Sequence, residues 1–98
     1  MNRDERNLYE EYFKKAVVEN VRRARIAKGL TQAELAEAID VSHEFVRALE
    51  SPKGKKTFSA FTIFRIAQAL DVSLDTLLDF DMKKFQSIIE KAMQEKSS

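Results

Sequence analysis

Residues 31–50, TQAELAEAIDVSHEFVRALE, decide the fold of this chain. Thr31 and Glu34 have the spacing of a capping box, which is typical of the first turn of a helix. A break at residues 40–41 separates this helix from a second one, which Ser42 is able to cap. The stretch therefore predicts two short helices joined by a tight turn. Their inner positions are expected to be Leu35, Ala36, Ile39, Val41, Val46 and Leu49.

Further helices are expected on both sides of these two. Apolar residues recur every three or four positions from Leu8 to Ala24, which predicts one amphipathic helix, or two joined helices, up to Lys28. Gly29 follows at a position where a left-handed C-terminal cap is favoured. After a polar and basic loop at 53–58, three more helices are expected to begin at the capping residues Ser59, Ser73 and Asp81.

Two of these later helices have pronounced apolar faces. In the helix after Ser59, the residues expected to point inward are Phe61, Ile63, Phe64, Ile66, Ala67 and Leu70. The helix after Asp81 has an apolar strip formed by Met82, Phe85, Ile88, Ile89, Ala92 and Met93. With only two glycines and one proline in 98 residues, the pattern predicts a single all-α domain.

The composition excludes several classes of protein. A hydrophobic content of 44%, with 17 basic and 16 acidic residues, excludes a disordered chain. Cysteine is absent and His43 is the single histidine, so we expect no disulfide, no metal site and no cofactor. The apolar runs are too short to cross a membrane, and charges spread through the first 28 residues argue against a secretory leader. We expect a cytoplasmic protein.

Positive charge is concentrated in two windows of the sequence. Residues 21–30 contain four basic residues and no acidic one, and residues 51–60 contain three lysines and no acidic residue. Clustered charge of this kind is typical of a site for a polyanion, although an ordinary solvated surface gives the same pattern.

The two short helices of residues 31–50 form a helix-turn-helix, whose second helix faces outward and can enter the DNA major groove. Separate patterns agree with this reading: Arg25, Gly29-Leu30-Thr31-Gln32, Glu34-Leu35-Ala36, Val41-Ser42, Glu50 and residues 66–74. Together they resemble the phage-repressor and Cro-type (XRE-like) helix-turn-helix family over roughly Val21–Leu78. The resemblance implies a five-helix repressor-like domain, here with an extended N-terminal helix and an extra C-terminal helix. Most members of that family are homodimeric transcription regulators.

The resemblance also implies roles for individual residues. Contacts with DNA bases are implied for Ser42, His43, Glu44, Phe45 and Arg47. Contacts with DNA phosphates are implied for Arg22, Arg25, Lys28, Gln32, Lys53, Lys55, Lys56 and Thr57. Arg25 and Glu50 also resemble a structural ion pair that joins the first helix to the end of the third.

Two positions depart from the family pattern or leave alternatives open. Asp40 occupies a turn position that is usually glycine, and aspartate tolerates the left-handed conformation better than most residues. Glu44 is able to accept a hydrogen bond from cytosine N4, or to position His43 or Arg47.

Phe45 is a third unusual position. If Val46 and Leu49 point inward, Phe45 is not expected to do so. Its ring then either packs on a thymine methyl group or is an exposed apolar group with an unidentified partner.

The apolar strips at 8–17 and 82–93 lie outside the family core, which we expect at about 18–79. The terminal helices, 1–17 and 80–95, either cover each other within one subunit or pack across a two-fold axis. We expect a mixture of both, with a homodimer interface that includes Tyr12, Phe13, Leu78, Phe85, Ile88 and Ile89.

Three functions fit these features. The first is a sequence-specific DNA-binding transcription regulator, a homodimeric repressor of a palindromic operator on double-stranded DNA. The second is an antitoxin that binds DNA and also masks a toxin. A protein partner such as an antirepressor is compatible with the repressor function. The third is a protein-interaction module that has lost DNA binding. We expect no enzyme, because the sequence shows no nucleophile and base set, no phosphate loop and no metal cluster.

Overall fold

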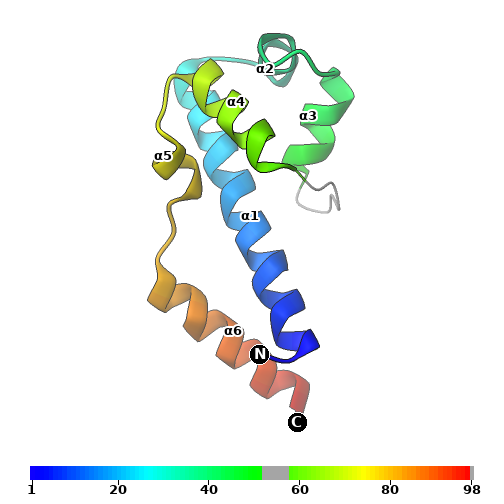
Figure 1. Ribbon diagram of the computed structural model, residues 1–98, viewed down its shortest axis with the longest axis vertical. Coiled ribbons are helices and arrows are strands. Elements are labelled where there is room, and N and C mark those ends of the chain that lie inside the picture. The colour runs from blue at the N-terminus through cyan, green and yellow to red at the C-terminus, as the bar shows by residue number, and fades with distance from the viewer. Residues whose placement is uncertain (52–57, 98) are drawn as a thin grey trace.

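The computed structural model describes residues 1–51 and 58–97, and this part of the chain is all-helical. A long N-terminal helix and an extra C-terminal helix are both present, as the sequence predicts (Figure 1). Residues 3–28 form one continuous helix rather than two joined ones. The helices are α1 (Arg3–Lys28), α2 (Gln32–Ala38), α3 (His43–Glu50), α4 (Ala60–Leu70), α5 (Leu74–Leu78) and α6 (Met82–Ser97).

Side-chain caps fix where the helices begin, because the first backbone N–H groups of a helix have no partner inside it. The expected capping box is present: the Thr31 hydroxyl accepts from the Glu34 N–H at 3.0 Å, and the Glu34 carboxylate accepts from the Thr31 N–H at 2.9 Å. Asp81 accepts from the Lys84 N–H at 3.1 Å at the start of α6. The serines predicted to cap α3, α4 and α5 do so, namely Ser42, Ser59 and Ser73.

Two tight breaks need a left-handed backbone. Gly29 ends α1 with φ 79°, as predicted. Asp40, in the turn between α2 and α3, has φ 57°, which agrees with the tolerance of aspartate for this region. Asp71 ends α4 in the same conformation, with φ 55°.

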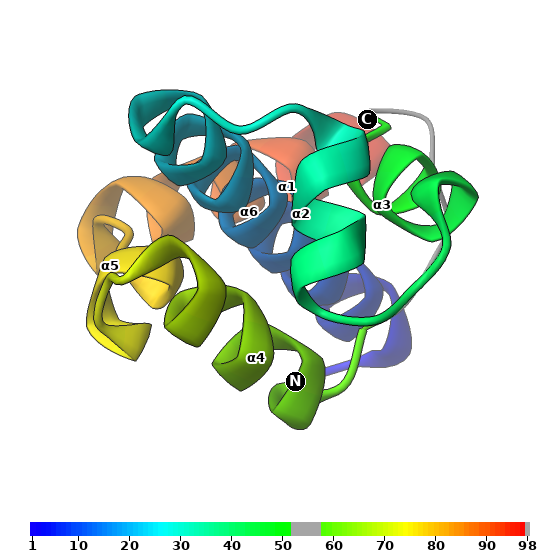
Figure 2. The same ribbon diagram turned by 90° about the horizontal axis from the view of Figure 1, so that it is seen from above.

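The core lies where the C-terminal half of α1 meets α2, α3, α4 and α5 (Figure 2). Of the six inner positions predicted for residues 31–50, five are buried and Val41 is half-buried. At the end of α5, the Asn20 amide donates to the Leu77 and Asp79 carbonyl oxygens at 3.0 and 2.7 Å, which ties that helix to α1. The largest fully buried side chains are Leu35, Ile39, Leu49, Ile66, Leu77, Ile89, Val17, Val21 and Val46.

The predicted apolar face of α4 is partly wrong. Phe61 is 66% exposed and Phe64 is 42% exposed, and their rings stack on each other with centroids 6.0 Å apart. The helix buries a narrower stripe, formed by Ile63, Ile66, Ala67 and Leu70. These four residues recur at the helical repeat, and the two phenylalanines lie beside the stripe rather than on it.

The N-terminal half of α1 and helix α6 form the other end of an elongated molecule of 46 × 24 × 20 Å (Figure 1). Aromatic contacts join them: the ring centroids of Tyr9 and Phe85 are 5.5 Å apart, and those of Phe13 and Phe80 are 5.6 Å apart. Ile89, which the sequence placed at a dimer interface, is only 1% exposed. It is therefore covered within the chain, because α6 packs against α1 through this face.

Candidate nucleic-acid interface

Helices α2 and α3 form the expected helix-turn-helix. Val46 and Leu49 are 0% and 1% exposed, so one side of α3 is fixed in the core. Ala36 is buried as well, and its carbonyl oxygen accepts from the Val41 N–H at 3.0 Å across the turn. The core thus fixes α3 from one side and leaves its other side to the solvent.

The first turn of α3 faces the solvent. Ser42, His43 and Glu44 are all exposed. The Ser42 hydroxyl accepts from the Phe45 N–H at 3.0 Å as the helix cap, so its hydrogen can still be donated to another group. Glu44 forms an ion pair with the exposed Arg47, which agrees with one of the alternatives that the sequence left open for Glu44. The turn therefore presents both hydrogen-bond donors and acceptors.

Phe45 departs from the expectation that it faces away from the core. It is half-buried and packs against the hydrophobic core. The reason is helical geometry: position 45 lies one turn before Leu49, so its ring is at the edge of the buried face. Only part of this ring can reach a base, so Phe45 is a weaker candidate for base contact than the other four residues.

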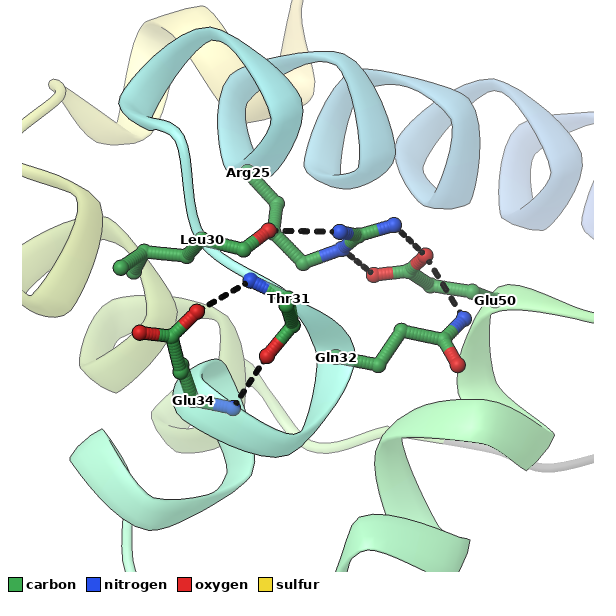
Figure 3. Close-up of polar contacts among 6 residues, drawn as sticks. All are labelled: Arg25, Leu30, Thr31, Gln32, Glu34 and Glu50. Carbon is green, nitrogen blue, oxygen red and sulfur yellow. Dashed lines mark hydrogen bonds and ion pairs between the residues drawn. The ribbon is translucent and has the colours of Figure 1, made fainter.

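Arg25 and Glu50 form a salt bridge that joins α1 to the end of α3 (Figure 3). Nε and Nη2 of Arg25 donate to the two carboxylate oxygens of Glu50 at 2.7 and 2.9 Å. Nη1 donates to the Leu30 carbonyl oxygen at 2.7 Å. Arg25 and Glu50 are 9% and 6% exposed, so the pair is desolvated as well as bidentate.

This geometry gives Arg25 a structural role, because three of its five N–H groups donate within the chain and little of the residue is accessible. Its contact with a phosphate stays a prediction that rests on the two remaining N–H groups. Gln32 has a different position, because it is half-buried and its Nε2 donates to Glu50 at 3.1 Å. An amide has a second N–H and an acceptor oxygen, so Gln32 retains groups that can bind a phosphate.

The remaining candidates for phosphate contact divide into two groups. Arg22 and Lys28 are exposed on α1. The expected loop contacts lie outside the described residues, namely Lys53, Lys55, Lys56 and Thr57. The neighbouring Arg23 pairs with Glu19 at 3.3 Å on the surface.

One carboxyl group next to this surface, that of Glu34, has a shifted pKa. The Thr31 backbone N–H donates to the Glu34 carboxylate, and this bond, together with the Thr31 side chain, lowers the pKa of Glu34 below its usual value. The carboxylate is thereby kept charged at the N-terminus of α2, where negative charge is favoured.

Residues 1–51 and 58–97 contain no group of three or more His, Cys, Asp or Glu side chains placed to bind a metal ion. Among the helices in those residues, none is both long enough and apolar enough to pass through a membrane.

Comparison with known families agrees with this geometry. Residues 21–77 match the model of the helix-turn-helix family, from the middle of α1 into α5. No curated protein and no solved structure matches the chain. The matched region contains α2 and α3, whereas the N-terminal half of α1 and helix α6 lie outside it.

Proposed function

Because this chain belongs to the helix-turn-helix family of DNA-binding regulators of the XRE type, we propose that it is a homodimeric repressor. In this proposal it binds a palindromic operator through the major groove. The single observation that supports the proposal most is the exposed first turn of α3, on a helix whose other side is fixed by Val46 and Leu49. A rigid helix with one free polar face is what base reading in the major groove requires.

Base recognition is assigned to the exposed polar residues of α3. Arg47 donates to guanine O6 and N7, which are the acceptors that arginine reads best. Glu44 accepts from cytosine N4 or holds Arg47 in the correct orientation through the ion pair seen in the free protein. His43 and Ser42 are exposed in the same turn and contact neighbouring base edges.

Phosphate contacts on both sides of the groove supply most of the affinity. Gln32 lies at the first position of α2, and Lys28 lies at the last position of α1. These residues, with Arg22 and the basic loop at 53–57, are proposed to neutralise the backbone. The binding constant should therefore fall steeply as the salt concentration rises.

Dimerisation is proposed because apolar groups remain uncovered after the terminal helices have packed together. Phe13, Leu78 and Ile88 are 36%, 39% and 37% exposed. A two-fold dimer of this kind presents two copies of α3 a whole number of DNA turns apart, about 34 Å for each turn, and recognises a palindrome. It represses by blocking the polymerase at a promoter that overlaps its operator. A protein with this function acts in the cytoplasm.

In vitro selection of binding sites from random duplexes tests this function. The account predicts an inverted repeat whose half-sites are centred about 10 base pairs, or a multiple of that spacing, apart. Selected duplexes without any shared sequence would contradict base reading. A protein that also fails to bind nonspecific duplex at low salt would be an interaction module that has lost DNA binding.

A further inference from the structure

An apolar groove lies between the N-terminal part of α1 and the start of α6. It is in the half of the molecule away from α2 and α3 (Figure 1). Its volume is about 590 Å³, and all of its residues lie outside the region that matches the helix-turn-helix family. The groove is lined by Arg6, Tyr9, Glu10, Phe13, Phe80, Met82 and Phe85.

The floor of this groove is aromatic. The rings of Tyr9 and Phe80 each contact Phe85, with centroids 5.5 and 5.0 Å apart. These three residues are half-buried, whereas Phe13 and Met82 at the margins are 36% and 69% exposed. Contiguous exposed apolar surface of this kind is a mark of an interaction site. Methionine at the margin is suited to filling an irregular contact, because its side chain is flexible.

The charges of the groove indicate what occupies it. Arg6 and Glu10 are its two charged residues, and they lie one turn apart on α1, both exposed. Within residues 1–51 and 58–97, neither of them belongs to an ion pair. One positive and one negative group sum to zero, so the surface does not repel a copy of itself.

Two-fold symmetry makes this charge arrangement self-complementary. In a two-fold contact, residue i of one copy meets residue j of the other, and residue j meets residue i. When two copies of α1 run antiparallel with the axis between these residues, each Arg6 lies opposite the other copy's Glu10. A partner of one charge sign would instead attract one of these groups and repel the other.

We infer that the groove between α1 and α6 is the dimer interface, and that its occupant is the same groove of a second copy. The inference rests on the proposed homodimer and names its surface. That surface keeps Phe13 and Phe85 from the residues expected there and adds Arg6, Tyr9, Glu10, Phe80 and Met82. The contact covers Phe13 and Met82 and leaves α2 and α3 of both copies uncovered.

Charge reversal across the axis tests the interface in the full-length chain. Sedimentation equilibrium at 50 mM salt should show a wild-type dimer. Arg6→Glu and Glu10→Arg should each raise the dissociation constant about tenfold, because each change turns two rim attractions into two repulsions. The combined variant Arg6→Glu/Glu10→Arg should return to within about threefold of the wild type, since the pairs are restored with exchanged partners.

Lys91→Glu is the matched control, because it makes the same charge change at an exposed position of α6 that does not line the groove. It should leave the dissociation constant unchanged. Circular dichroism of every variant shows whether the fold is retained, and all three positions are exposed. Met82→Ser should also weaken the dimer, independently of charge.

Two results would overturn the inference, and they are distinguishable from failure of the proposed function. If the groove variants remain dimeric but Phe61→Ser is monomeric, the interface lies on α4. The proposal of a homodimeric regulator is then retained. A wild-type monomer refutes both the groove and the homodimer. In that case site selection still decides whether the protein reads DNA.

Discussion

Replacing Arg25 by methionine is expected to cost about 3 kcal/mol of unfolding free energy. The change removes the partner of a carboxylate whose side chain is 2% exposed, together with hydrogen bonds to Glu50 and the Leu30 carbonyl oxygen. Loss of one partner from a buried ion pair costs about 3–5 kcal/mol, because the other charge stays buried without compensation. We expect the lower end of this range, since Gln32 continues to donate to Glu50.

Urea unfolding followed by circular dichroism measures this cost. In a domain of this size, a loss of about 3 kcal/mol lowers the melting temperature by more than about 10 °C. Arg47→Met is the matched control, because Arg47 and Glu44 form an ion pair whose side chains are 62% and 71% exposed. An exposed pair of this kind contributes less than about 1 kcal/mol.

The double variant Arg25→Met/Glu50→Leu completes the test. It replaces both charges with apolar groups, so it should be more stable than Arg25→Met alone. If Arg25→Met cost no more than Arg47→Met, the buried pair would not be what joins α1 to α3. Costs that simply add in the double variant would refute the coupling between the two residues.

Four further predictions concern the turn, a carboxylate, the basic loop and the recognition helix. Asp40→Val should lower the unfolding free energy by about 1–2 kcal/mol, whereas Asp40→Gly should be nearly neutral, because φ is 57° there. The stabilisation by Glu34 should be complete above its unfolded pKa of about 4.3 and lost as the pH falls through its lower folded pKa. Unfolding of Glu34→Gln should accordingly depend less on pH as the pH falls below the unfolded pKa. The three loop lysines, Lys53, Lys55 and Lys56, are replaced together by alanine. The salt slope of DNA binding should then fall by about 0.9 for each phosphate that is no longer neutralised. An unchanged slope would show that these lysines lie away from DNA. His43→Ala should alter the preferred operator sequence and change the unfolding free energy by less than about 0.5 kcal/mol, which site selection and urea unfolding measure.

Local rules were sufficient to predict where α2 to α6 begin. Capping by Thr31, Ser42, Ser59 and Ser73 depends on side chains three residues from the groups they satisfy, so it can be read from spacing alone. The left-handed turn at Asp40 follows from the same short-range sterics. These features place α3 and therefore define the candidate interface.

Tertiary packing accounts for what the sequence did not show. Helix α4 has more apolar residues than one buried stripe needs, and only its neighbours decide that Phe61 and Phe64 stay outside. Likewise, no local pattern shows that Ile89 of α6 is buried against α1 of the same chain. Nor does one show that Asn20 donates to carbonyl groups at the end of α5. The groove with Arg6 and Glu10 results from the same packing and was not predicted either.

Crosslinking from position 43 to DNA tests the central claim most directly. The chain contains no cysteine, so His43→Cys provides a single site for a photoreactive label. On a selected operator, the label should crosslink to major-groove bases in both half-sites, whereas the same label at the exposed position of Lys91→Cys on α6 should not. Crosslinking from position 91 but not from position 43 would show that the first turn of α3 does not enter the groove.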